Sequence, residues 1–280
     1  MKMRANTSLL ENVVAIAREA GAAIMNVYAR DFSAAEKQDK SPLTEADTAA
    51  HEVIIRHLKE LQPVLPILSE EAVGDFSGVD DSGRFWLVDP LDGTKEFIKR
   101  NGEFTVNIAL VEQGRAILGV VYAPVLDVAY LAAEGLGAFK EGADGKRVPI
   151  RVAEHKEGTI WRVVGSRSHA GDSLNAFLHQ LGSHELVPMG SSLKFCLVAE
   201  GAADVYPRLG PTSLWDTAAA QCVVEQSGGA VIQLSGEPVS YADPSVVLNP
   251  SFLVHGKSPV NWPDLMRGSM HRPAATRTIA

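Results

Sequence analysis

The segment 86–97, Trp-Leu-Val-Asp-Pro-Leu-Asp-Gly-Thr-Lys-Glu-Phe, constrains the fold of this chain more than any other stretch. The apolar run that leads into it is typical of a buried strand. We expect that strand to end at Asp89, because Pro90 cannot donate to a strand ladder. Residues 92–94 then have the composition of the first turn of a short helix. One loop therefore receives two carboxylates beside free backbone N–H groups, which suits a divalent cation next to a phosphate.

Acids elsewhere in the chain decide how this loop is interpreted. Taken alone, Asp-Pro-x-Asp-Gly is a common turn sequence, so Asp89 and Asp92 have a purely structural explanation. Two distant acids favour a functional one. Glu70 follows the short apolar run 66–68, and Asp216 stands where a helix begins, although a plain N-cap would also place it there. We predict that these four acids, from three separated stretches, converge on shared divalent ions.

The hydrophobic pattern divides the chain into two halves and a tail. Periodicity predicts two N-terminal helices and then a run of strands. The alternating strands and helices that follow suggest an α/β second half. We place an N-terminal α+β half with most metal ligands at 1–158, and a C-terminal α/β half with Asp216 and the specificity residues at 159–257. The tail at 258–280 has no period, and we expect it to be disordered. The predicted helices span 10–28, 44–61, 173–181, 191–200 and 215–226, and the predicted strands span 66–70, 84–89, 104–111, 116–122, 128–132, 138–140, 161–165, 184–188 and 204–206.

Composition restricts the partners of the chain. With 26 Lys and Arg against 34 Asp and Glu, the formal net charge is -8, which repels a phosphate backbone, so we expect no nucleic-acid partner. A small anionic ligand stays compatible, because local cations or metals can override the global field. Cys196 and Cys222 lie in apolar runs and are typical of buried, reduced thiols in a cytoplasmic protein. We find neither a signal peptide nor a stretch long and uncharged enough to span a membrane.

Three separated motifs resemble those of a known superfamily. Ser69-Glu70-Glu71, the stretch 89–94 and the stretch 215–219 resemble, in this order, the three metal motifs of the inositol monophosphatase superfamily. The middle motif is long, and the ordered set of three is a specific signal. The resemblance implies an α+β fold class, the layered αβαβα sandwich of that superfamily, with an active site between the two halves, where pockets commonly lie.

Further stretches narrow the resemblance. The stretches 95–104, 190–196 and 206–208 are similar to the CysQ-type 3'(2'),5'-bisphosphate nucleotidases, and the likeness runs from about Leu10 to about Val254. It implies a magnesium-dependent phosphomonoester hydrolase that acts through a metal-activated water. Adenosine 3',5'-bisphosphate would be converted to AMP and phosphate. The sulfated relative, 3'-phosphoadenylyl sulfate, is a second candidate substrate and would give adenylyl sulfate.

The resemblance also assigns roles to individual residues. It implies that two or three Mg²⁺ ions are held by four carboxylates and one carbonyl oxygen, those of Glu70, Asp89, Asp92, Asp216 and Leu91. Thr94 would orient or deprotonate the attacking water, with Asp47 behind it. Asp47 has an alternative explanation, because an acid in the first turn of a helix is favoured by the helix dipole.

A bisphosphate substrate needs cations away from the metals, and the second half of the chain offers them. Lys194 and Arg208 are the candidates for the second phosphate, and His169 is a weaker one. Lys95 either attracts the polyanion or is an exposed helix residue. The residues expected to contact substrate are Glu70, Leu91, Asp92, Gly93, Thr94, His169, Ser191, Lys194, Arg208 and Asp216.

Two other functions fit the same residues. An inositol monophosphatase or another small sugar-phosphate phosphatase would share the metal site and would not need Lys194 or Arg208. A non-catalytic sensor of nucleotide bisphosphates would keep the pocket without turnover. We expect a cytoplasmic protein, with a peripheral position on the cytoplasmic face of the inner membrane as an alternative, and the sequence allows a homodimer.

Overall fold

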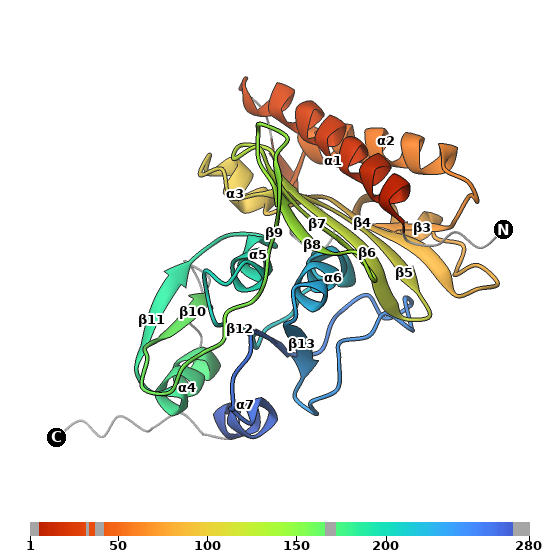
Figure 1. The fold of residues 1–280 in the computed structure, drawn as a ribbon. Coiled ribbons are helices and arrows are strands. Elements are labelled where there is room, and N and C mark those ends of the chain that lie inside the picture. The colour runs from red at the N-terminus through yellow and green to blue at the C-terminus, as the bar shows by residue number, and fades with distance from the viewer. Residues whose placement is uncertain (1–5, 32–33, 37–41, 166–171, 271–280) are drawn as a thin grey trace.

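The structure is a computed structural model that describes residues 6–31, 34–36, 42–165 and 172–270. Its elements form five layers, which alternate between helices and sheets (Figure 1). Helices α1 and α2 cover the outer face of a seven-stranded sheet, and α5 and α6 lie between that sheet and a five-stranded one. Helices α4 and α7 cover the far face of the smaller sheet. The predicted αβαβα layering is confirmed.

The seven-stranded sheet carries the segment that the sequence singled out. Its strand order is β3-β4-β5-β6-β7-β8-β9. β3 and β4 are parallel, whereas every following pair is antiparallel. The strands are β3 (Ile67–Ser69), β4 (Arg84–Asp92), β5 (Thr105–Glu112), β6 (Arg115–Ala123), β7 (Val128–Ala133), β8 (Gly137–Glu141) and β9 (Arg147–Pro149).

The five-stranded sheet belongs to the second half of the chain, in the order β11-β10-β12-β14-β13. β10 pairs in parallel with β11 and β12, and β14 runs antiparallel to its neighbours β12 and β13. The predicted strands of this half are present, and β13 and β14 were not predicted. The strands are β10 (Trp161–Gly165), β11 (His184–Pro188), β12 (Val205–Arg208), β13 (Ala230–Gln233) and β14 (Phe252–His255).

Helices and short turns complete the described chain. The short strands β1 (Ala34–Glu36) and β2 (Pro42–Thr44) pair with each other, directly before α2. The helices are α1 (Thr7–Tyr28), α2 (Glu45–Glu60), α3 (Thr94–Ile98), α4 (Asp172–Leu181), α5 (Leu193–Ala199), α6 (Ala218–Gln226) and α7 (Trp262–Met270), and the 3-10 turns are η1 (Glu70–Asp75) and η2 (Leu214–Asp216).

The tail expected to be disordered is helical in part. Residues 262–270 form α7, whose Trp262 and Met266 are buried against Phe177 of α4 and the smaller sheet. These two apolar residues lie four apart, on one helical face, so their burial stabilises the helix although the surrounding composition is polar. The prediction was therefore wrong for 262–270, and 271–280 lie outside the described residues.

Close packing of α6 on the large sheet brings the start of that helix towards the end of β4. Gly119 of β6 lies in register between Ala109 and Ala132 on the neighbouring strands. This part of the sheet surface therefore carries only small side chains. An added Cβ at Gly119 would lie 2.2 Å from the carbonyl oxygen of Ala219 in α6. Small residues on both sides therefore set the distance between the helix and the sheet.

We predict that Gly119→Ala destabilises the protein by about 1–3 kcal/mol, because the added methyl overpacks a backbone contact. Gly74→Ala is the matched control, since an added Cβ there meets nothing within 4 Å. Urea unfolding of both variants measures the difference. Equal stability of the Gly119 variant and the wild type would show that α6 can move away without cost.

Candidate metal and phosphate site

Three acids from separate stretches of the chain meet at one edge of the large sheet. Glu70, Asp89 and Asp216 each place a carboxylate oxygen within 4.8 Å of the others. Glu70 directly follows β3, and Asp89 lies on the parallel neighbour β4, with Ser69 paired to Val88. Because parallel strands end at the same edge, the two carboxylates arrive side by side. Asp216 closes the group from η2, in the layer behind the sheet.

The loop after Asp89 differs in detail from the prediction. β4 does not stop at Pro90 but continues to Asp92, which pairs with Thr105 after a shift in register. Such an irregularity changes the direction of the strand without ending it. The N–H of Leu91 donates to Asp89 Oδ1 over 3.0 Å. Asp92 thereby reaches the same edge as Asp89.

Asp92 is held by Ser192, which is not among the substrate contacts that the sequence predicted. Ser192 donates to Asp92 Oδ2 through its backbone N–H at 2.5 Å, and its hydroxyl oxygen lies 2.7 Å from the same atom. That hydroxyl is also 2.8 Å from the carbonyl oxygen of Asp216, and it accepts from Asn107 Nδ2 over 2.8 Å. The predicted Ser191 lies beside it, buried and with a positive φ. In the sequence, Asn107 stands out only because it is a polar residue inside an apolar run.

The acids repel one another strongly. Burial raises the pKa of Asp89 well above its usual range, and the nearby carboxylates of Glu70, Asp92 and Asp216 raise it further. Burial, followed by the charge of Asp92, raises the pKa of Asp216 to about 7. A buried group of like charges needs either protons or a cation.

The donor atoms fit a hard divalent cation. All are oxygens, from carboxylates and potentially from the Leu91 carbonyl, and this part of the site offers neither sulfur nor imidazole. Oxygen donors favour Mg²⁺, Ca²⁺ or Mn²⁺ over zinc. The cluster can therefore bind a metal of the class that the sequence predicted.

Thr94 and Asp47 lie next to the acids. Thr94 Oγ1 is 3.4 Å from Asp47 Oδ1 and 3.4 Å from the Leu91 carbonyl oxygen. The other oxygen of Asp47 accepts from the backbone N–H and hydroxyl of Thr44, in the capping box of α2. The functional and the structural explanations of Asp47 therefore apply to different oxygens of one carboxylate.

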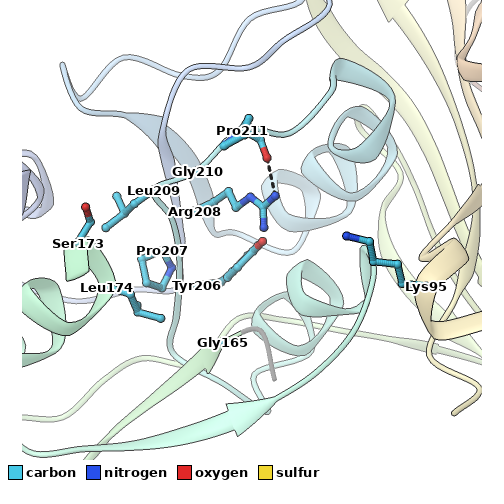
Figure 2. A pocket seen from close by; sticks show the side chains of 10 residues that line it. All are labelled: Lys95, Gly165, Ser173, Leu174, Tyr206, Pro207, Arg208, Leu209, Gly210 and Pro211. Atoms are coloured by element: carbon cyan, nitrogen blue, oxygen red, sulfur yellow. Dashed lines mark hydrogen bonds between the residues drawn. The ribbon is translucent and has the colours of Figure 1, made fainter. Parts of the chain in front are cut away.

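A cleft extends from the acids into the second half of the molecule. A cavity of about 400 Å³ is lined by Asp92, Thr94 and Asp216, among others. Lys95 and Arg208 also line it, and they line a neighbouring cavity of about 430 Å³ with the apolar residues Leu174, Pro207 and Leu209 (Figure 2). The two cavities thus form one path with acids at one end and an apolar wall at the other.

Arg208 lines both cavities, and Lys194 lines a third, smaller cavity of about 60 Å³ beside Asp92 and Asp216. Arg208 donates from Nη2 to the Pro211 carbonyl oxygen, while its buried Nε has no hydrogen-bond partner among the described residues. The Lys194 ammonium lies 5.7 Å from the centre of the Tyr206 ring, and burial lowers its pKa. Figure 2 shows Lys95 pointing from the opposite wall towards Arg208. His169 lies outside the described residues.

Two expectations concern features away from the cleft. Cys196 and Cys222 are buried and unpaired by a disulfide, as predicted. Among the residues that the structure places, we find no helix with the length and apolar character needed to cross a bilayer.

Comparison with known proteins relates this chain to phosphatases. The model of the inositol monophosphatase family matches residues 5–259. The 3'(2'),5'-bisphosphate nucleotidase CysQ of Salmonella typhimurium is 52% identical over 248 residues, which cover 88% of this chain and 99% of the relative. The nucleotidase CysQ of Haemophilus influenzae is 34% identical over 259 residues, covering 92% of this chain and 96% of the relative.

Solved structures agree with the layered architecture. CysQ from Bacteroides thetaiotaomicron, a bacterial member of the inositol monophosphatase family, superposes with a TM-score of 0.76 at 39% identity, covering 90% of this chain and 98% of that one. The extragenic suppressor protein suhB from Bartonella henselae superposes with a TM-score of 0.78 at 24% identity, covering 95% and 100%. The second likeness shows the fold alone.

We predict that Mg²⁺ stabilises the protein more at about pH 8 than at about pH 6. The raised pKa values of Asp89 and Asp216 mean that the metal-free folded state binds more protons than the unfolded state. Its stability therefore falls as the pH rises from about 4 towards 7. Mg²⁺ relieves the repulsion above that range, and protons compete with it below. Thermal unfolding with and without Mg²⁺ at both pH values tests this, and equal shifts would contradict it.

We predict that Ser192→Ala weakens Mg²⁺ binding by about 10-fold or more, because Asp92 loses the hydroxyl that orients its carboxylate. Ser227→Ala is the matched control, since Ser227 is also buried and its hydroxyl donates only to the Val224 carbonyl in the residues described. Calorimetric titration of both variants with Mg²⁺ measures the effect. Equal weakening in the two variants would mean that Ser192 acts on stability alone.

Proposed function

This chain belongs to the inositol monophosphatase family, and on that premise we propose that it is a magnesium-dependent 3'(2'),5'-bisphosphate nucleotidase. One observation carries the proposal beyond the family. The acids share a cleft with Lys95, Lys194 and Arg208, so a second anionic group can be held away from the reacting phosphate. The relatives named as nucleotidases at 34–52% identity support the same activity.

The shape of the cleft suits a nucleotide with two phosphates. The phosphate to be removed would lie at the acids, and the second phosphate would accept hydrogen bonds from Arg208, whose buried Nε lacks a described partner. The apolar wall around Leu174, Pro207 and Leu209 offers a surface for the nucleoside. Adenosine 3',5'-bisphosphate would thus give AMP and phosphate, and 3'-phosphoadenylyl sulfate would give adenylyl sulfate.

The metal site would be built from the residues that the sequence predicted. Glu70, Asp89, Asp92, Asp216 and the Leu91 carbonyl would hold two or three Mg²⁺ ions. When bound, such ions lower the pKa of water and neutralise charge on phosphoryl and leaving oxygens. Ser192 and Asn107 keep Asp92 in the orientation that binding requires.

The protein's own groups would handle the water and the phosphoryl oxygens. Thr94 Oγ1 would accept a hydrogen bond from the attacking water and relay its proton towards Asp47 Oδ1, which lies 3.4 Å away. The backbone N–H groups of Gly93 and Thr94 would donate to the phosphoryl oxygens. Ser191 and Lys194, which line the same small cavity as Asp92 and Asp216, would contact the substrate. His169 stays a prediction.

The division into two halves, the oligomeric state and the location of the protein are proposals as well. The two halves at 1–158 and 159–257, a homodimer and a cytoplasmic location fit this function, and a peripheral membrane position remains an alternative. An inositol or sugar monophosphate phosphatase would use the same acids, but it would leave Arg208 and Lys194 without a ligand. Phosphate release with Mg²⁺ also separates turnover from mere sensing of the nucleotide.

We predict that Arg208→Gln lowers kcat/KM for adenosine 3',5'-bisphosphate by about 10–100-fold, the loss expected for hydrogen bonds to a charged group. Adenosine 3'-monophosphate lacks the second phosphate, so its kcat/KM should change little. Phosphate release from both nucleotides and from inositol 1-phosphate measures this, with Arg151→Gln, an exposed arginine outside the cleft, as the control.

Two outcomes would contradict the proposal. If Arg208→Gln lowers the kcat/KM of both nucleotides equally, Arg208 does not bind the second phosphate. If the wild type hydrolyses inositol 1-phosphate with a higher kcat/KM than the bisphosphate, the specificity is wrong even though the hydrolase chemistry holds.

A further inference from the structure

A separate cavity lies between α2 and the edge strand β3, and the proposed function does not use it. Its volume is about 370 Å³, within the range of about 300–1,000 Å³ common for small-molecule sites. It shares no lining residue with the three cavities of the catalytic cleft. β3 is the outermost strand of the sheet, beside the end of α2 (Figure 1).

One wall of this α2–β3 cavity is a stripe along the helix. His51, Ile55 and Lys59 are spaced four residues apart, so they lie above one another on one face of α2. The loop that follows the helix adds apolar surface, including Val64, whose exposed fraction is 56%. Covering this surface with an apolar group would remove it from water, which favours binding.

The polar groups around the cavity are few and differ in charge. Lys59 supplies a cation and Asp75, from η1, supplies an anion. Neither forms an ion pair or a side-chain hydrogen bond with another described residue. Burial lowers the pKa of His51, so its imidazole is mostly neutral near pH 7. The charges of the lining therefore cancel, and both charged side chains are exposed to solvent at the cavity.

We propose that the α2–β3 cavity binds a small zwitterion with an apolar body, of the amino-acid class. Its carboxylate would pair with Lys59 and its ammonium with Asp75. Its side chain would cover the apolar surface at Ile55 and Val64. Asp75 would repel a ligand with only a negative charge, and Lys59 would repel one with only a positive charge. Both kinds of ligand are therefore less complementary to the cavity.

The position of the cavity connects such a ligand to the metal site. His51 Nδ1 lies 2.9 Å from Ser69 Oγ, in a hydrogen bond between α2 and β3. Ser69 is buried and directly precedes Glu70, and His51 lies one helical turn after Asp47. A ligand against His51 and Ser69 therefore touches the contact between the two elements that carry Glu70 and Asp47. Binding in the cavity and binding of Mg²⁺ are then linked, each changing the affinity of the other.

Calorimetric titration with L-phenylalanine as the probe tests the site. N-Acetyl-L-phenylalanine lacks the ammonium, and L-phenylalaninamide lacks the carboxylate, so each should bind about tenfold more weakly or worse. Lys59→Met should weaken L-phenylalanine by a similar factor and leave L-phenylalaninamide unchanged. Asp75→Asn should weaken L-phenylalanine and leave the N-acetyl analogue unchanged. Lys156→Met, the same change at an exposed lysine outside the cavity, should have no effect.

Four results would overturn parts of this inference. Absence of heat with L-phenylalanine, or equal affinity for the three probes, would rule out the zwitterion site. Weakening of all probes by Lys59→Met would show a change in folding instead of a lost charge pair, and would also count against it. Unchanged Mg²⁺ affinity in the presence of bound L-phenylalanine would rule out the link through His51 and Ser69. None of these titrations requires nucleotide turnover, so they stay separate from tests of the proposed function.

Discussion

The mutual repulsion of buried carboxylates is the constraint around which this molecule is arranged. Glu70, Asp89 and Asp216 lie within 4.8 Å of one another, and Asp89 is almost fully buried. Such a group is unfavourable without a counter-charge, so the polypeptide must supply the stability that keeps it together. The parallel pair β3–β4, covered by helices on both faces, gives that support through apolar burial. Binding of a cation would therefore relieve a repulsion that destabilises the metal-free state.

Packing between the layers brings together residues that lie far apart in the sequence. Asp216 comes from the second half, yet it reaches the strand that carries Asp89, since α6 approaches the sheet closely at Gly119. Ser192, also from the second half, then ties Asp92 to the main chain of Asp216. Substrate cations such as Arg208 come from the same half. The two halves thus meet at the acids, and neither forms the cleft alone.

Local patterns carried most of the fold and the acids of the site. The β4 run, the capped start of α2 and the acid shortly before α6 are all visible in short windows of sequence. Other features depend on partners far along the chain. Ser192 and Asn107 are 85 residues apart in the sequence, and only folding brings them within hydrogen-bonding distance. Helix α7 was missed because two buried residues outweigh a polar composition. β13 and β14 are short apolar runs, which local sequence alone does not assign to strands.

The carboxylate of Asp47 takes part in two separate contacts. Its Oδ2 closes the capping box of α2, and its Oδ1 faces Thr94. A substitution of Asp47 would therefore affect both the cap of α2 and the proton transfer that we propose for Oδ1. Measuring the stability and the activity of such a variant together would separate the two effects, because loss of the helix cap lowers both, whereas loss of the proposed proton transfer lowers activity alone.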